Sequence, residues 1–304
     1  MLELLFLGTG AGVPSRQRAT SCVAVRNGSD IFLFDCGEGS QRQMMISPFS
    51  FMKIRAIFIT HLHGDHVFGL PGLLQTMSLS GRKDPVKVYG PKGIANCVET
   101  FMSVTEGDTV YPLEVEELAG GESFEIGNSL ISTYPTVHGI PSVGYVIKEK
   151  DHPGKLDREK ALSLGIADGP DMARLKNGET VKGVSPEQVI GEPVKGVSIS
   201  YTGDTMPCDS VIEGSAGVTV LVHESTYMSD AEDLAKEHFH STAAQAAEAA
   251  KACGASHLIL THLSHRYRNP APVENEARKI FPSSYAAADL QLYEVRPDGI
   301  TVRL

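Results

Sequence analysis

One short stretch constrains this chain more than any other. It is the heptapeptide THLHGDH at residues 60–66, which directly follows a largely apolar, β-branched run at residues 54–59. In an extended segment that leaves a strand, alternate side chains share one face, so His61, His63 and Asp65 can point the same way. His66 breaks the alternation and must face differently. Three imidazoles and a carboxylate at this spacing predict a metal site.

The same spacing favours two metal ions over one. We expect His61 and His63 to serve one ion, and Asp65 and His66 to serve the other. Zinc suits neutral imidazole and carboxylate ligands, and manganese and iron accept the same ligand types. The alternative interpretation is a group of polar loop residues near the surface with no metal.

Three other strand-like runs each end in a ligand-type residue. His138 follows residues 130–137, Asp204 follows residues 196–201, and His262 follows residues 256–260. Side chains at strand ends can converge on one crevice. Alone, His138 or His262 would more often be a structural histidine. Together with the first cluster they complete a set of seven predicted ligands: His61, His63, Asp65, His66, His138, Asp204 and His262. Asp204 has two carboxylate oxygens and can bridge the two ions.

Length and patterning predict one α/β domain. The chain has 304 residues and is 41% hydrophobic, enough for a large core. Short β-rich stretches alternate with helical patterns, the clearest of which is the Ala-rich run at residues 242–252. The predicted strands are residues 3–7, 21–26, 31–34, 55–59, 86–89, 129–136, 142–147, 197–201, 219–222 and 257–260. Two β-rich halves with helices outside would form a layered sandwich. Residues 67–80 are apolar over most of a helical circumference, which predicts a buried helix or one that meets a partner subunit.

Residues 151–193 have a different pattern. Six glycines and four prolines punctuate this segment, and no long periodic face is present. We therefore predict one domain over residues 1–304, with residues 151–193 inserted as a flexible, protruding, hairpin-like arm without a second core.

The net charge of −10 argues against a nucleic-acid partner at first sight, because phosphate contacts usually come with a basic face. Residues 148–196 are neutral, however, with nine basic and nine acidic side chains. Local basic groups could still follow an RNA backbone. The candidates are Arg16, Arg18, Lys148, Lys150, Lys155, Arg266 and Arg268.

Targeting and redox signals are weak. The N-terminal apolar run stops at Gly8, and no later run is long enough to span a bilayer, so we expect a cytoplasmic location and no membrane contact. The five cysteines are scattered and form no C-x-x-C pair, which predicts neither a disulfide framework nor a thiolate metal site.

The ligand order resembles that of the metallo-β-lactamase superfamily, with its H-x-H-x-D-H motif, later single histidine, bridging aspartate and final histidine. Within it, the chain looks most like the tRNase Z family. Asp35 is similar to the superfamily's early acidic residue, HEST at residues 223–226 to the family's H-E-A-T loop, and HST at residues 240–242 to its H-S-T loop. Asp168-Gly169-Pro170 resembles the Gly-Pro motif of a tRNA-binding arm. Residues 14–18 resemble a substrate loop, with Arg16 for the usual Lys and Ala19 for the usual Asn.

This resemblance implies a four-layered αββα sandwich, two zinc ions per subunit with manganese as a substitute, and a homodimer. It also implies a zinc-dependent endoribonuclease that removes the 3′ trailer of precursor tRNA, leaving a 3′ hydroxyl on the tRNA and a 5′ phosphate on the trailer. Asp65 would ligate an ion and take the proton of the attacking water. His240, oriented by Glu224, would protonate the leaving oxygen. Without the resemblance, His240 would be a helix-entry residue, with Ser241 or Thr242 as the cap.

Three alternatives differ from this reading. The same scaffold could hydrolyse small phosphodiesters, lactones or thioesters, or it could be a non-catalytic RNA-binding or partner subunit. A diiron relative that reduces oxygen is disfavoured, because His63 stands where such proteins usually carry a carboxylate. The turn GTGAG at residues 8–12 invites a dinucleotide reading, but its third glycine is one place early and Pro14 interrupts the expected helix. A sharp turn close to the substrate is better supported.

Overall fold

The computed structural model describes residues 1–105 and 107–303. The chain divides into two compact units, one formed by residues 1–149 and 197–304 and the other by residues 150–196. The first unit contains two β-sheets, and the second contains three short helices.

The first sheet has eight strands in the order β15-β14-β1-β2-β3-β4-β5-β6. Strands β3 to β6 run parallel, and the remaining neighbours are antiparallel. Alternate residues of β1 enter opposite cores: Leu4 and Phe6 face one, while Leu5 and Leu7 face the other. The strands are β1 (Leu2–Gly8), β2 (Cys22–Asn27), β3 (Asp30–Phe34), β4 (Ile54–Phe58), β5 (Val86–Gly90), β6 (Leu113–Glu117), β14 (Leu292–Arg296) and β15 (Gly299–Arg303).

The second sheet has seven strands in the order β13-β12-β11-β10-β9-β8-β7. Strands β10 to β13 are parallel, so their carboxyl ends lie at one edge of the sheet. The strands are β7 (Ser123–Ile126), β8 (Ser129–Pro135), β9 (Val143–Glu149), β10 (Ser198–Tyr201), β11 (Val220–Glu224), β12 (His257–Thr261) and β13 (Ser284–Ala286).

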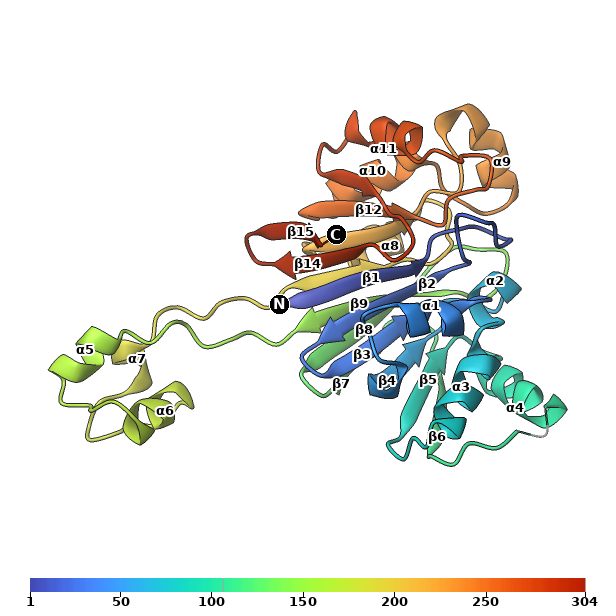
Figure 1. Ribbon diagram of the computed structural model, residues 1–304. Helices are drawn as coiled ribbons and strands as arrows, with labels where there is room; N and C mark the ends of the chain where they lie inside the picture. The colour runs from blue at the N-terminus through green and yellow to red at the C-terminus, as the bar shows by residue number, and fades with distance from the viewer. Residues whose placement is uncertain (106, 304) are drawn as a thin grey trace. The chain divides into compact units, whose positions relative to one another are not determined.

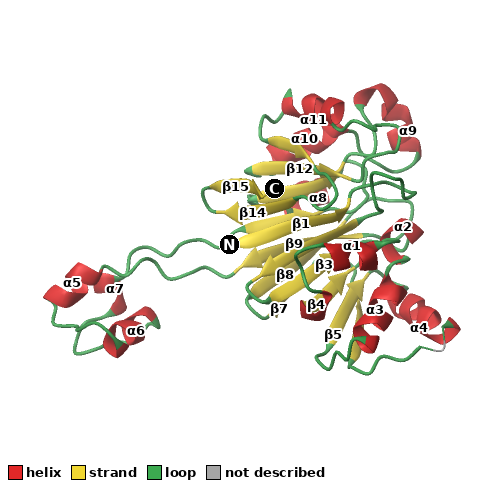
Figure 2. Cartoon of the chain, in the orientation of Figure 1, coloured by secondary structure: helices red, strands yellow, loops and turns green. Residues whose placement is uncertain are grey.

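The sheets pack face to face, and helices cover both outer faces (Figures 1 and 2). Aromatic rings fill the space between the sheets; Phe58 lies 5.2 Å from Tyr145, centroid to centroid. On the first sheet lie α1 (Ser40–Ile46), α2 (Gly64–Val67), α3 (Leu70–Leu79) and α4 (Ile94–Val104); on the second lie α8 (Asp209–Gly214), α10 (Ala243–Ala252) and α11 (Ala271–Arg278), while α9 (Glu232–Glu237) precedes α10. This is the predicted αββα sandwich.

The single helix predicted over residues 67–80 is divided into α2 and α3. The break falls at Gly69, whose N–H donates to the Cys36 carbonyl at 2.9 Å. A Cβ at Gly69 would lie 2.1 Å from the Gly37 carbonyl oxygen, so only glycine fits there. Helix α3 buries Leu70, Leu73, Leu74 and Met77, but Leu79 is 90% exposed and Phe68 is 62% exposed. Residues 67–80 were predicted to be either buried or in contact with a partner subunit. Burial therefore holds for one face of this segment only.

The second unit contains α5 (Arg158–Ser163), α6 (Pro170–Lys176) and α7 (Pro186–Val189). Its two limbs pair antiparallel at the bridge between His152 and Val194, as a hairpin-like insertion would. The absence of a second core was predicted wrongly. Seven buried apolar side chains, among them Ala161 and Leu175, form a small cluster of their own. The spacing of these residues is irregular because the helices are only one or two turns long, so no periodic face is visible in the sequence.

Within residues 1–105 and 107–303, no helix combines the length and apolar character needed to cross a membrane.

Candidate metal centre

The THLHGDH segment leaves the carboxyl end of β4 and enters α2, with His63 at the helix N-cap position. His61 and His66 are fully buried, His63 is exposed, and Asp65 is half-buried. The turn into α2 at Gly64 ends the extended geometry after His63. It therefore sends His66 to a different side of the site, as the broken alternation predicts.

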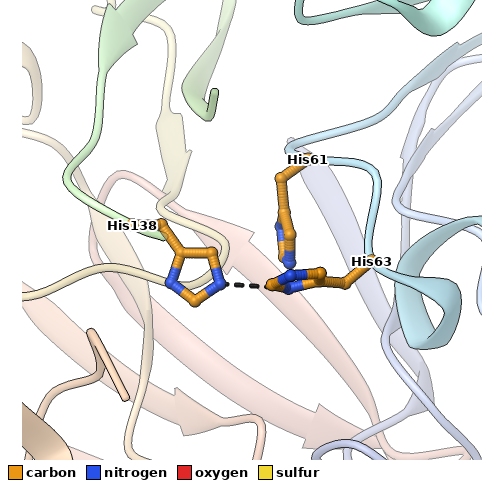
Figure 3. A group of neighbouring side chains, drawn as sticks. All are labelled: His61, His63 and His138. Carbon is orange, nitrogen blue, oxygen red and sulfur yellow. Dashed lines mark hydrogen bonds between the residues drawn. The ribbon is translucent and has the colours of Figure 1, made fainter. Parts of the chain in front are cut away.

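The structure brings all seven predicted ligands together. His61, His63 and His138 form one group, and Asp65, His66 and His262 form another (Figure 3 for the first). Asp204 groups with His61 and His66, and also with His262 and His240, so it lies between the two sets. Within each group the ligand atoms are at most 4.8 Å apart.

The distances between donor atoms fit metal coordination. Two ligands of one tetrahedral zinc, each about 2.0 Å from the ion, lie roughly 3.3 Å apart. His138 Nε2 is 3.1 Å from His63 Nδ1, and His61 Nε2 is 3.6 Å from Asp204 Oδ2. On the other side, Asp65 Oδ2 is 3.3 Å from His262 Nε2 and 3.5 Å from His66 Nε2.

Buried polar atoms without partners point to the same place. Among the described residues, His61 Nε2, His66 Nε2 and Asp204 Oδ1 are buried and accept or donate no hydrogen bond. A buried polar atom left in this state costs about 1–3 kcal/mol. Their convergence is explained if each atom is a metal ligand, and the donor set therefore fits a pair of divalent cations.

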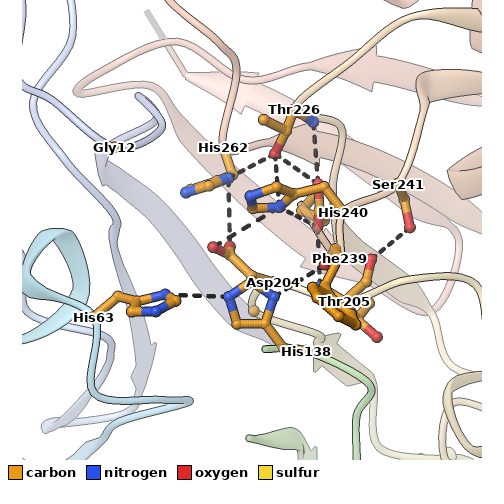
Figure 4. A network of polar contacts seen from close by, with 12 residues as sticks. Gly12, His63, His138, Asp204, Thr205, Thr226, Phe239, His240, Ser241 and His262 are labelled. Carbon is orange, nitrogen blue, oxygen red and sulfur yellow. Dashed lines mark hydrogen bonds and ion pairs between the residues drawn. The ribbon is translucent and has the colours of Figure 1, made fainter. Parts of the chain in front are cut away.

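Neighbouring groups select the free nitrogen of two of these imidazoles. His66 Nδ1–H donates to Asp35 Oδ2 at 2.7 Å, and His138 Nδ1–H donates to the Phe239 carbonyl at 2.9 Å. A carboxylate or carbonyl only accepts, so Nδ1 carries the proton and Nε2 stays free for a metal. The αL backbone of Phe239, with φ of 58°, aims that carbonyl (Figure 4).

Asp35 holds the THLHGDH segment in place. It is fully buried and accepts hydrogen bonds from the Thr60 amide at 2.7 Å and the Tyr201 hydroxyl at 2.8 Å, as well as from His66. Its φ of 60° lies in the left-handed region, which few non-glycine residues other than Asn and Asp adopt. The Asp35 carboxylate thus links the end of β3, the THLHGDH segment and β10.

Electrostatics keep two of the predicted ligands, His61 and Asp204, in the forms that bind cations. Burial lowers the pKa of His61 well below its usual value, so its imidazole is neutral. For Asp204, burial alone would raise the pKa, but the adjacent His262 and His66 outweigh it and lower the pKa well below 3.8. A neutral imidazole therefore faces an anionic carboxylate at the centre of the site.

A second polar cluster adjoins the ligands. His240 Nδ1–H donates to Glu224 Oε1 at 2.8 Å, and the other Glu224 oxygen accepts from the Thr226 hydroxyl at 2.6 Å. Burial works to lower the pKa of His240, but the charge and hydrogen bond of Glu224 prevail and raise it to about 9. Thr242 caps α10 through Gln245, so the helix-entry reading of this loop is also correct.

Thr226 is a site residue that sequence reasoning missed. Its hydroxyl proton goes to Glu224, so its oxygen accepts from His262 Nδ1–H at 2.8 Å, and His262 Nε2 faces Asp65 Oδ2 at 3.3 Å. It therefore joins the Glu224–His240 pair to a metal ligand (Figure 4). Its place in the HEST loop, two residues after Glu224, was the available signal.

The ligands open into a cavity of about 430 Å³. His63, Asp65, His138, Asp204, His240 and His262 line it, and the turn at Ala11–Val13 forms one wall. Predicted metal ligands and the predicted proton donor therefore face the same space.

Comparisons with known proteins agree with this geometry. Residues 2–152 match the family model described as anti-Pycsar protein Apyc1, and residues 171–263 match that of the beta-lactamase superfamily domain. Ribonuclease Z of Methanothermobacter thermautotrophicus is 43% identical over 300 residues, covering 97% of each chain. Ribonuclease Z of Bacillus licheniformis is 42% identical over 305 residues, covering 97% of this chain and 99% of the relative.

This chain belongs to the ribonuclease Z family. The solved structure of human tRNase Z, short form, agrees: it superposes with a TM-score of 0.73 at 30% identity, covering 97% of this chain and 99% of that one. The ribonuclease Z relationship confirms the family and the metallo-β-lactamase sandwich predicted from the motifs, and it sets the oxygen-reducing diiron alternative aside.

Proposed function

We propose that this chain is a metal-dependent endoribonuclease that removes the 3′ trailer from precursor tRNA by hydrolysing a phosphodiester bond. The products would be a tRNA with a 3′ hydroxyl and a trailer with a 5′ phosphate. The observation that carries the proposal is the shared cavity, where five of the seven predicted metal ligands and His240 face one space, with Glu224 bonded to His240 behind it. The relatives' names, ribonuclease Z and tRNase Z, supply the substrate class.

Two zinc ions are the proposed cofactors, with manganese as a substitute. His61, His63 and His138 would hold one ion and Asp65, His66 and His262 the other, with Asp204 between them. When bound, such ions supply Lewis acidity toward a phosphoryl oxygen and lower the pKa of water.

The chain's own residues would move the protons. Asp65 lines the cavity and stays ionised: burial alone would raise its pKa, but the adjacent His262 and His66 outweigh burial and lower it. It can therefore accept the proton of the attacking water. His240 holds its proton at neutral pH and can give it to the leaving 3′ oxygen. Glu224 orients His240 and keeps it charged.

The arm at residues 151–193 is the proposed tRNA-binding exosite. Its exposed cations include Lys155, Lys160 and Lys176, while Arg158 and Arg174 pair with Asp168 and Glu179. A cavity of about 610 Å³ on this unit is larger than the metal cavity but has no histidine among its lining residues, so we assign it no chemistry. Exposed lysines on a module with its own small core suit contact with an RNA backbone.

A homodimer is proposed from the exposed apolar side chains of the α1–α3 region. Met45, Ile46, Phe68 and Leu79 are each more than half exposed. Helix α1 packs on α3, so these side chains share one part of the unit. A second copy would remove them from water, which is the partner environment predicted for residues 67–80. The proposed cytoplasmic location follows from the substrate.

One assay tests the function. Purified protein is incubated with 3′-extended precursor tRNA and with a chromogenic phosphodiester, each with and without chelator, and the RNA ends are mapped. We expect a metal-dependent cut at the 3′ end of the tRNA, with a 3′ hydroxyl upstream and a 5′ phosphate downstream. Metal-dependent turnover of the small diester alone, with precursor tRNA intact, would favour the small-molecule phosphodiesterase instead.

A further inference from the structure

The loop between β1 and β2 carries no predicted metal ligand but contacts one. The Gly12 N–H donates to Asp65 Oδ2 at 2.8 Å. Asp65 Oδ2 also faces His66 and His262, so the amide helps to set the position of an oxygen assigned to the metal. Gly12 has φ of 71°, a left-handed conformation that favours glycine. The loop is therefore part of the outer support of the metal centre.

Both ends of this loop are held by one carboxylate from the other end of the chain. Asp289 Oδ1 accepts from the Thr9 amide at 3.0 Å and the Thr9 hydroxyl at 2.7 Å. Its other oxygen accepts from the Ala19 amide at 2.7 Å and from Gln43 Nε2 at 3.3 Å. The half-buried side chain thus joins the first and last turns of the loop.

Backbone contacts transmit this restraint toward the metal ligands. Gly10 N–H donates to the Ala19 carbonyl at 2.9 Å, which closes the base of the loop. Leu263, the residue after His262, donates to the Thr9 carbonyl at 2.8 Å and accepts from Ala11 N–H at 3.2 Å. Displacement of Thr9 or Ala19 would therefore move residues on either side of Gly12.

The same loop places cations beside the site. Arg16 and Arg18 line a cavity of about 460 Å³ together with His265 and Arg268. His265 also lines the metal cavity, so the two cavities adjoin. Arg18 is held by a hydrogen bond from its guanidinium to the Tyr267 carbonyl at 2.9 Å.

We propose that Asp289 is a positioning residue for the reaction. By joining Thr9 to Ala19, it sets the Gly12 amide against Asp65 and keeps the loop arginines next to the metal cavity. The effect on metal binding depends only on this chain's geometry, whereas the effect on RNA rests on the proposed function.

The test uses Asp289→Asn, which keeps the shape but removes one of two carboxylate acceptors and the charge. Its matched control is Glu122→Gln. Glu122 also accepts from two backbone amides, those of Ala119 and Gly120 at 2.9 Å each, and from the Thr133 hydroxyl, and none of these residues lines the metal cavity. Zinc affinity is measured by competition with a chromogenic chelator, and kcat and KM are measured on precursor tRNA.

We expect Asp289→Asn to weaken zinc binding about tenfold and to raise KM for precursor tRNA about tenfold, on the scale of outer-shell substitutions. Glu122→Gln should change both by less than twofold, even if the thermal midpoints of the two variants fall equally. Equal zinc affinities and KM values for the two variants would overturn the proposal. If wild-type protein does not cut precursor tRNA, the proposed function fails while the zinc comparison still decides the role of Asp289.

A second pair of variants tests the same proposal in case Asp289→Asn does not fold. Gly12→Ala strains a left-handed residue while its Cβ meets no atom within 4 Å, and Gly28→Ala does the same in the β2–β3 turn, where φ is 61°. We expect weaker zinc binding for Gly12→Ala only. Equal affinities for both variants would contradict a role for the loop.

Discussion

The metal centre and the arm are built in opposite ways. The predicted ligands come from segments as far apart as Asp65 and His262, are mostly buried, and several are held by a hydrogen bond to a residue outside the ligand set. The unit that contains the arm folds from 47 consecutive residues around seven buried apolar side chains, and its ion pairs lie at the surface. Chemistry requires donor atoms placed to within about 0.5 Å, which a large core can supply. Contact with an RNA backbone tolerates a looser, locally folded module.

The largest effect should come from His63→Ala, which removes a ligand without disturbing the buried core, because His63 is exposed. We expect loss of cleavage of both precursor tRNA and the chromogenic diester, by more than about 10³-fold, since a metal-assisted reaction loses its metal. Metal analysis and initial rates check this. A variant with full zinc content and near-normal rates would show that the chemistry lies elsewhere.

Deletion of residues 152–192 should separate the two regions. The limbs pair next to the cut, at His152 and Val194, where N–H and carbonyl are 2.9 Å apart, so residues 151 and 193 come close enough for a Gly-Ser linker to rejoin them. We expect cleavage of precursor tRNA to fall by at least about 100-fold, through lost backbone contacts, while turnover of the diester changes less than about threefold. An unchanged rate on precursor tRNA would contradict the exosite.

His240→Ala probes the proton donor within the metal centre. General acid catalysis contributes about 10²–10⁴-fold, so cleavage of precursor tRNA should slow by that amount. A nitrophenolate leaves without protonation, so the diester rate should fall less than about tenfold. Equal losses with the two substrates would refute the assignment of His240 as the acid.

The rate of precursor tRNA cleavage should also depend on pH in the way that a proton donor at His240 requires. The pKa of His240 is raised to about 9, so its protonated form is present below that pH and is lost above it. The rate on precursor tRNA should therefore decline as pH rises through about 9. Glu224→Gln removes the charge that raises this pKa and should move the decline at least about one unit lower. The pH profile measured with the diester serves as the control. If the decline at high pH stays at the same pH in Glu224→Gln, the Glu224–His240 pair is not its origin.

The smallest effect should come from a single arm cation. Lys176→Ala removes one exposed charge and should raise KM for precursor tRNA about twofold, with the salt slope of log KM reduced by about one. Lys87→Ala, an exposed lysine of the first unit paired with Glu114, is the matched control. Identical salt slopes for the two variants would argue against RNA contact at Lys176.

Local sequence patterns predicted most of the strands of the two sheets. The apolar runs that became β1 to β5 and β8 to β12 are each long enough to be visible alone, and so was α10. Strands β6 and β7 were missed because they lie largely exposed at sheet edges with charged residues such as Glu114 and Glu125. Strand β14 was missed because it depends on pairing with β1, and β15 because it depends on pairing with β14. The small core of the arm was missed for a similar reason, since its helices are too short to show a period.

Imidazole and carboxylate groups at strand ends, together with the spacing of residues 61–66, predict a metal site without any knowledge of the fold. How those groups are supported became visible only once the chain was folded. Asp289 lies 280 residues from Thr9, Thr226 joins His262 to Glu224, and the Phe239 carbonyl selects the tautomer of His138. Such contacts depend on distances between segments that are remote along the chain, and no local pattern encodes a distance of that kind.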